Sequence, residues 1–148
     1  MSHPLFEKHR ATIERALQAI AERSYWSLYP ESASPKVYGE GAAEAGKAAF
    51  DALLGKPFPL TQPGTVGAVG GERSPYGIEL GVTYPKADLD ALFAGVADAA
   101  AGWRAAGPEA WVGVCVEALA RINQASFEIA HAVMHTTGQA FMMAFQAG

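Results

Sequence analysis

The last eight residues before Gly148 place the strongest constraint on how this chain can fold. From Ala140 to Ala147 only Gln146 has a side chain that favours water. A helix formed here would be apolar almost all the way round, and such helices lie inside larger proteins. We therefore expect the segment to be covered by a second copy of the chain or by the remainder of a longer protein. The side chains predicted at this interface are Phe141, Met142, Met143 and Phe145.

Length and charge narrow the class of protein. The 148 residues suit one domain, and with half of them hydrophobic the chain can bury a core. A net charge of -4, with scattered Lys and Arg, provides no basic stripe for a nucleic-acid backbone. Cys115 is the only cysteine, which excludes an internal disulfide and favours a reducing, cytoplasmic location. The N-terminal residues have no apolar block of the kind found in a secretory signal, and no apolar stretch reaches the roughly 20 residues of a membrane span.

Apolar spacing predicts a mainly α fold of five or six helices with a glycine-rich middle. We expect helices over residues 2–23, with Ser2 as N-cap, and 41–54, closed by Gly55. Further helices are expected over 88–106, from Pro108 through Ile122, and from Ser126, as N-cap, to Thr136. The predicted organisation is one helical region: a hairpin with an aromatic loop over 1–55, a Gly/Pro-rich arm over 56–87, and helices over 88–148.

The segments between the predicted helices have their own signals. Residues 25–35 combine aromatic side chains with serines and prolines, which predicts an extended loop. Residues 62–77 contain too much glycine for a stable helix, whereas Ile78, Leu80 and Val82 alternate as in a strand. We expect short strands or an extended arm here, and a loop of this length could also bind a ligand.

Two glycine patterns resemble nucleotide-binding motifs. Residues 41–48 read Gly-Ala-Ala-Glu-Ala-Gly-Lys-Ala, but Ala48 lacks the hydroxyl that a phosphate loop places on magnesium, and the intervening residues favour helix. The glycines at 64, 67, 70 and 71 have the wrong spacing for a dinucleotide fingerprint. We predict no cofactor-binding residues in the chain.

Three further sets of side chains are candidates for a metal site or a catalytic nucleophile. Glu128, His131 and His135 share one helical face, but Ile129, Ala130, Val133 and Met134 occupy the arc expected to meet the core, so we predict that the first three face solvent and bind no metal. Cys115 lies among valines with no base one turn away, which favours a buried thiol over a nucleophile. Ser74 precedes a proline and has no nucleophile elbow. No catalytic residue is predicted.

The order of several short motifs resembles a known family. An alanine-rich helix ending in Trp103, a Pro-Glu helix start, a Leu-Ala seam and a helix closing on Thr-Gly resemble the N-terminal helices of aldehyde dehydrogenases. Trp111 departs from that pattern, which commonly has an arginine there. The first half of the chain resembles, more narrowly, the extended N-terminal region of PaaN-type phenylacetic acid degradation proteins. The motifs that carry this resemblance are Tyr25-Trp26, Pro30-Glu31, Ser34-Pro35-Lys36, Tyr38-Gly39-Glu40, Gln62-Pro63-Gly64, Ser74-Pro75-Tyr76-Gly77 and Tyr84-Pro85.

The resemblance implies a function for a longer parent protein. That parent would oxidise an aldehyde, a semialdehyde of phenylacetate breakdown, to an acid with NAD or NADP. Its cysteine nucleophile, glutamate base and cofactor-binding strands would follow the Thr-Gly segment, so the resemblance implies that this chain is an N-terminal fragment without catalytic activity. The alternative is a free-standing helical interaction or oligomerisation module. In either case we expect self-association or contact with the missing remainder through the C-terminal apolar helix.

Overall fold

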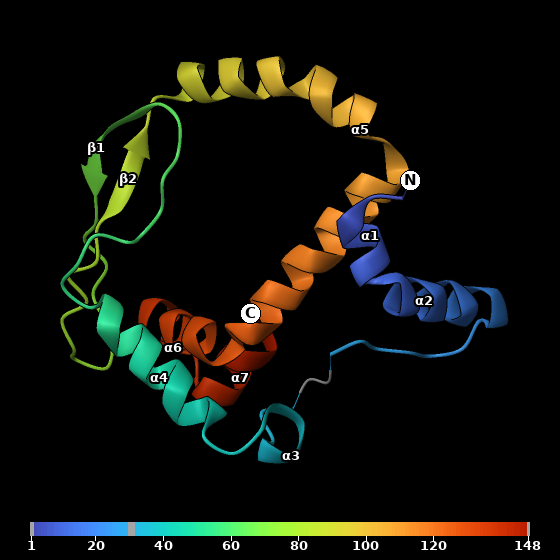
Figure 1. Ribbon diagram of the computed structural model, residues 1–148. Helices are drawn as coiled ribbons and strands as arrows, with labels where there is room; N and C mark the ends of the chain where they lie inside the picture. The colour runs from blue at the N-terminus through green and yellow to red at the C-terminus, as the bar shows by residue number, and fades with distance from the viewer. Residues whose placement is uncertain (1, 30–31, 148) are drawn as a thin grey trace. The chain divides into compact units, whose positions relative to one another are not determined.

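The chain folds into two compact units. The computed structural model describes residues 2–29 and 32–147 (Figure 1), so the Pro30-Glu31 motif lies outside the described residues. The first unit contains Met1–Pro30 and Ala100–Gln124, and the second contains Glu31–Ala99 and Ala125–Gly148. Seven helices and two strands are found in the described part, which confirms the mainly α class with an extended middle. None of the helices described is long and apolar enough to cross a bilayer.

The first unit begins with two helices where the sequence predicted one. Helix α1 (Pro4–Lys8) starts with the Nδ1 atom of His3 accepting a hydrogen bond from the Leu5 amide, so His3 and not Ser2 is the N-cap. Helix α2 (Arg10–Glu22) follows after a break at His9 and ends at Arg23 in a left-handed conformation. At the break the backbone of His9 is non-helical, with φ of -107° and ψ of 11°, and the His9 imidazole contacts Glu117 of helix α5.

Helix α5 (Leu89–Gln124) is two helices joined at a kink. Asp88 precedes it, and its carboxylate accepts a hydrogen bond of 2.8 Å from the Ala91 amide, as an N-cap does. Gly107 is non-helical, with a φ of 81°, and Pro108 begins the next turn. The predicted boundary between two helices at this pair of residues is therefore confirmed, since proline suits a first turn and glycine a left-handed position.

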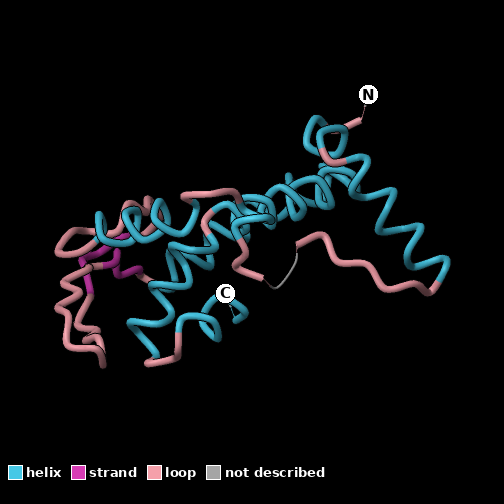
Figure 2. The backbone as a smooth tube through the Cα atoms, turned by 90° about the horizontal axis from the view of Figure 1, so that it is seen from below, coloured by secondary structure: helices cyan, strands magenta, loops and turns pink. Residues whose placement is uncertain are grey.

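The core of the second unit lies among its helices. Helices α4 (Ala42–Leu53) and α7 (Phe141–Ala147) both pack against α6 (Ser126–Thr137), and Figure 2 traces the same helices from below. The buried cluster consists of Phe127, Ala130 and Phe145. Gly46 is needed at the crossing of α4 and α6, because a Cβ atom there would lie 2.2 Å from the Cβ of Phe127.

The ends of the helices in this unit can be compared with the predicted caps and boundaries. Gly55 and Gly138 follow α4 and α6 in left-handed conformations, as predicted. Ser126 is the first residue of α6 and does not cap it, because Ala125 occupies the N-cap position. Residues 35–38, for which the sequence predicted no helix, form the short helix α3 (Pro35–Tyr38), since the Ser34 hydroxyl caps the Lys36 amide and Pro35 fits the first turn.

The glycine-rich arm contains the predicted short strands at other positions than the alternation indicated. Strand β1 (Thr65–Val69) pairs antiparallel with β2 (Tyr84–Ala87). Residues 78–82 form no strand, although Leu80 and Val82 are buried. Glu79 in this stretch forms only an isolated antiparallel bridge with Arg73, and Gly77 and Gly81 have positive φ angles close to it on either side.

Candidate functional site

The most specific side-chain arrangement of the second unit is a stack of aromatic rings between α4 and α6. The buried Phe50 ring lies 5.1 Å from the His135 ring at an interplanar angle of 6°, and 5.9 Å from the His131 ring at 24°. The other side of His131 contacts Phe141 of α7, with 4.9 Å between ring centroids. The prediction that both histidines face solvent is wrong. Because α6 packs against both α4 and α7, two of its faces are covered and not one.

His135 also connects α6 to the arm. Its Nδ1 atom lies 2.8 Å from the Ser74 hydroxyl, which itself accepts a hydrogen bond from the Tyr76 amide. In the neutral tautomer that leaves Nδ1 without a hydrogen, the Ser74 hydroxyl donates to Nδ1 while it accepts from the Tyr76 amide. The Tyr76 hydroxyl lies 3.0 Å and 2.9 Å from the carbonyl oxygens of Gly138 and Gln139 and donates there. Ser74 is thus a buried structural hydroxyl, and the helix end is tied to the arm at two points.

The environment of the two histidines favours their neutral forms. Burial is the main cause that lowers the pKa of each imidazole, and the positive charge of Lys47 lowers both further, whereas Asp51 opposes the shift. The Nδ1 atom of His131 is buried and has no hydrogen-bond partner among the described residues. The described part of the chain contains no group of three His, Cys, Asp or Glu side chains able to hold a metal ion. The two imidazoles stack 6.5 Å apart on the Phe50 ring and do not converge on a common point.

The first unit contains an ion cluster centred on Glu117. This carboxylate is 8% exposed and accepts hydrogen bonds from Lys8 Nζ at 2.6 Å, His9 Nε2 at 2.8 Å and Arg121 Nε at 2.9 Å. The bonds from Lys8, His9 and Arg121 lower the pKa of Glu117 to about 2. The sequence reading missed this cluster. The one available signal was a carboxylate within the otherwise apolar helical face of residues 110–119.

The four residues predicted as one interface are divided by the structure. Phe145 is 7% exposed and belongs to the core, and Phe141 packs against that core. Met142 and Met143 are 50% and 62% exposed. Of the four residues, the two methionines are the most exposed, because α7 turns Phe145 toward α6 and Tyr38 and packs Phe141 partly against the same core.

Helix α5 exposes a larger apolar face than α7. Leu89, Phe93 and Val96 are each about two-thirds exposed or more, at 66%, 71% and 68%. Their spacing of four and three residues places them on one side of the helix. Apolar side chains exposed together on one side of a helix are a candidate surface for contact with another molecule.

The second half of α5 buries a different side from the one that carries Cys115. Ala110, Gly113 and Glu117 are buried there, and a Cβ on Gly113 would lie 2.6 Å from the Phe6 backbone nitrogen. Cys115 is consequently exposed, so its predicted burial is wrong. The backbone of α1 comes close to this side of α5, so only small residues such as Ala110 and Gly113 fit there. The larger side chains around Cys115 lie on the other sides of the helix.

Trp111, the departure from the family pattern, makes a local contact. Its Nε1 atom donates a 2.6 Å hydrogen bond to the Trp103 carbonyl oxygen, and the two rings lie 6.3 Å apart. This pair bridges the Gly107 kink within the first unit.

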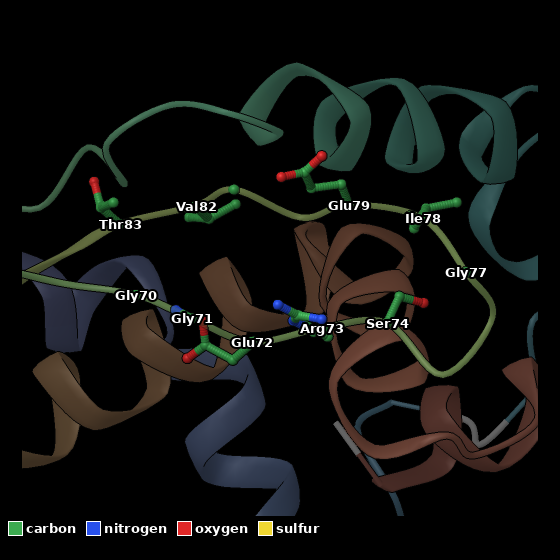
Figure 3. A pocket seen from close by; sticks show the side chains of 11 residues that line it. Gly70, Gly71, Glu72, Arg73, Ser74, Gly77, Ile78, Glu79, Val82 and Thr83 are labelled. Carbon is green, nitrogen blue, oxygen red and sulfur yellow. Dashed lines mark hydrogen bonds between the residues drawn. The ribbon is translucent and has the colours of Figure 1, made fainter.

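The glycine motifs do not form a nucleotide cradle. Residues 42–48 are helical, so their amides are committed to helix α4, whose Ala45 amide already bonds to the Gly41 carbonyl. Gly70 and Gly71 line an open hollow of about 680 Å³ between two extended stretches, residues 70–74 and 77–83. Figure 3 shows these stretches meeting at the turn around Gly77. No helix begins after these glycines until Leu89, so the geometry of a dinucleotide site is missing from the described residues.

Comparison with known proteins points to one enzyme class. No family model and no curated protein matches the chain. A solved structure, an NAD-dependent aldehyde dehydrogenase from Burkholderia multivorans, is 60% identical and superimposes with a TM-score of 0.90. The match covers 99% of this chain and 26% of that one. The chain thus spans about a quarter of its relative, and the similarity supports its place in the aldehyde dehydrogenase superfamily.

Proposed function

We propose that this chain is a non-catalytic part of an NAD-dependent aldehyde dehydrogenase. The observation that carries the proposal is the 60% identity over nearly all of this chain to a quarter of an enzyme of that class. The described residues contribute structure to it. Cys115 lies exposed on a helix, and neither glycine motif forms a cradle for a dinucleotide. No step of the oxidation is therefore assigned to residues of this chain.

The substrate class is proposed from the sequence motifs. The similarity of the first half of the chain to PaaN-type proteins supports an aliphatic semialdehyde, formed on ring opening during phenylacetate breakdown, that is oxidised to the acid. NAD is preferred over NADP because the enzyme with 60% identity is NAD-dependent. The cytoplasmic location predicted from the single cysteine stays a prediction.

The partner is proposed to be the remainder of the same enzyme. The face of α5 formed by Leu89, Phe93 and Val96, together with Met142 and Met143, is the apolar surface it would cover. Most of the proposed contact surface therefore lies on α5 and not on the C-terminal helix as the sequence predicted, because Phe141 and Phe145 pack within the second unit. The alternative of a free-standing interaction module is not favoured, because the match to the enzyme extends over 99% of the chain.

Two measurements test the proposal. The chain alone, incubated with NAD or NADP and a panel of semialdehydes, is expected to form no reduced cofactor, and turnover by the chain alone would refute its non-catalytic role. The intact mass of the natural gene product, detected with an antibody to this chain, is expected to be several times 15.5 kDa. A gene product with a mass near 15.5 kDa would favour the free-standing interaction module instead.

A further inference from the structure

His131 and His135 lie one turn apart on α6, where three other segments meet it. Phe50 of α4 stacks on both imidazoles, Phe141 of α7 covers His131, and Ser74 bonds to His135. We propose that the two histidines form a pH-sensitive contact that holds α4 and residues 74–76 against α6 while both imidazoles are neutral, and that loosens when they are protonated.

Protonation of His131 would leave a charge without compensation. Its Nδ1 atom is buried and has no partner among the described residues, so a hydrogen added there would have no acceptor. The rings on either side, Phe50 and Phe141, are apolar. Charging a desolvated imidazole with an unsatisfied donor is costly, and the expected response is separation of the packed helices to admit water.

Protonation of His135 would disturb the contact to the arm. In the neutral tautomer with the hydrogen on Nε2, the Ser74 hydroxyl accepts from the Tyr76 amide and donates to Nδ1. An imidazolium has two donors and no acceptor, so Ser74 would have to accept two hydrogen bonds and its own hydrogen would lose its partner. Ser74 is 7% exposed, which leaves water little access to replace that partner.

The charges around the pair do not reverse this preference. On α4, Lys47 repels an imidazolium, and its ammonium lies 2.5 Å from the Asp51 carboxylate, the nearest opposing charge. Glu44 of α4 lines a hollow with Lys47 and His131, and Glu128 lies on α6 itself. On the arm, Arg73 and Tyr76 flank Ser74, while α7 contains no ionisable side chain. The two imidazoles repel each other once both are charged.

The direction of the pH effect follows from the lowered pKa values. Both imidazoles have pKa values below the ordinary 6.5 in the folded chain. The unfolded or opened state therefore binds protons first as the pH falls, and the stability of the contact is complete above pH 6.5 and declines below it. The loss ends once the pH has passed the pKa values of the folded state.

Hydrogen exchange of the whole chain tests the proposal. Between about pH 7.5 and about pH 5.5, after correction for intrinsic rates, we expect faster exchange in residues 42–53 and 126–137, with residues 65–69 as reference, because this interval crosses the histidine range. The variant His131→Phe/His135→Asn keeps an aromatic ring at 131 and an acceptor for Ser74 at 135, and should lose the acceleration. Equal acceleration in wild type and variant, or none in wild type, overturns the proposal.

A second measurement uses only the wild-type chain and so tests the proposal even if the double variant does not fold. NMR titration of the wild-type imidazole signals is expected to give pKa values below 6.5 for both residues. A value at or above 6.5 for either imidazole overturns the proposal.

Discussion

The carboxylate Oε2 of Glu117 lies 2.8 Å from Nε2 of His9, although 108 positions separate the two residues in the chain. The contact joins the junction of α1 and α2 to the second half of α5, and Lys8 bonds to the same oxygen. The contact lies at the break between α1 and α2.

Replacement of Glu117 by Gln should remove the charge that holds this junction. The pKa of Glu117 is lowered from 4.5 to about 2, so its contribution to stability is complete above 4.5 and is lost as the pH falls toward 2. Urea unfolding should show Glu117→Gln less stable than wild type at neutral pH, with a gap that narrows below pH 4.5. Glu14→Gln, on the exposed face of α2, is the matched control and should change stability by no more than about 0.5 kcal/mol. Equal effects of the two variants would contradict the role of the cluster.

Gly46→Ala should destabilise the second unit. The added Cβ would meet the Cβ of Phe127 at 2.2 Å and force α4 away from α6, and overpacking of this kind costs about 1–3 kcal/mol. Gly95→Ala in α5 meets nothing within 4 Å and is the control. Because alanine favours helix over glycine, that variant should gain about 0.5–1 kcal/mol. The free energies of unfolding from urea titrations should therefore change in opposite directions, and a shared sign would argue against the tight crossing.

Phe145→Ala and Met142→Ala separate the two sides of α7. Phe145 is buried against Phe127 and Tyr38, so its truncation should cost about 3–5 kcal/mol. Met142 is 50% exposed, and its truncation should stay within about 0.5 kcal/mol. Thermal unfolding of the two variants checks this ordering. A large loss from Met142→Ala would indicate that the methionine is covered by another copy in solution.

Local signals in the sequence predicted the boundaries that glycine and proline determine. The Gly107-Pro108 boundary and the glycines after α4 and α6 follow from backbone preferences that each residue has by itself, whereas the alternation over residues 78–82 did not locate the strands. Which side of a helix is buried depends instead on the other elements that pack against that helix in the folded chain. The outward direction assigned to His131 and the buried state assigned to Cys115 failed for that reason, because one helical face was assumed to meet the core. The cluster at Glu117 joins residues far apart in sequence, which no local pattern shows.

The apolar face of α5 yields a test of the proposed partner. Phe93 is 71% exposed, so Phe93→Glu should leave the free energy of unfolding of the chain within about 0.5 kcal/mol of wild type. The same change should weaken binding to a separately expressed polypeptide that contains the rest of the enzyme, because it places a charge in an apolar contact. Asp98→Lys on the same helix changes the charge at a position outside the Leu89, Phe93 and Val96 stripe and serves as control. Isothermal titration calorimetry measures the affinity of each variant for that polypeptide. If Phe93→Glu and wild type bound the remainder equally well, the contact would lie elsewhere on the chain; if wild type self-associated and Phe93→Glu did not, this face would be an interface between copies.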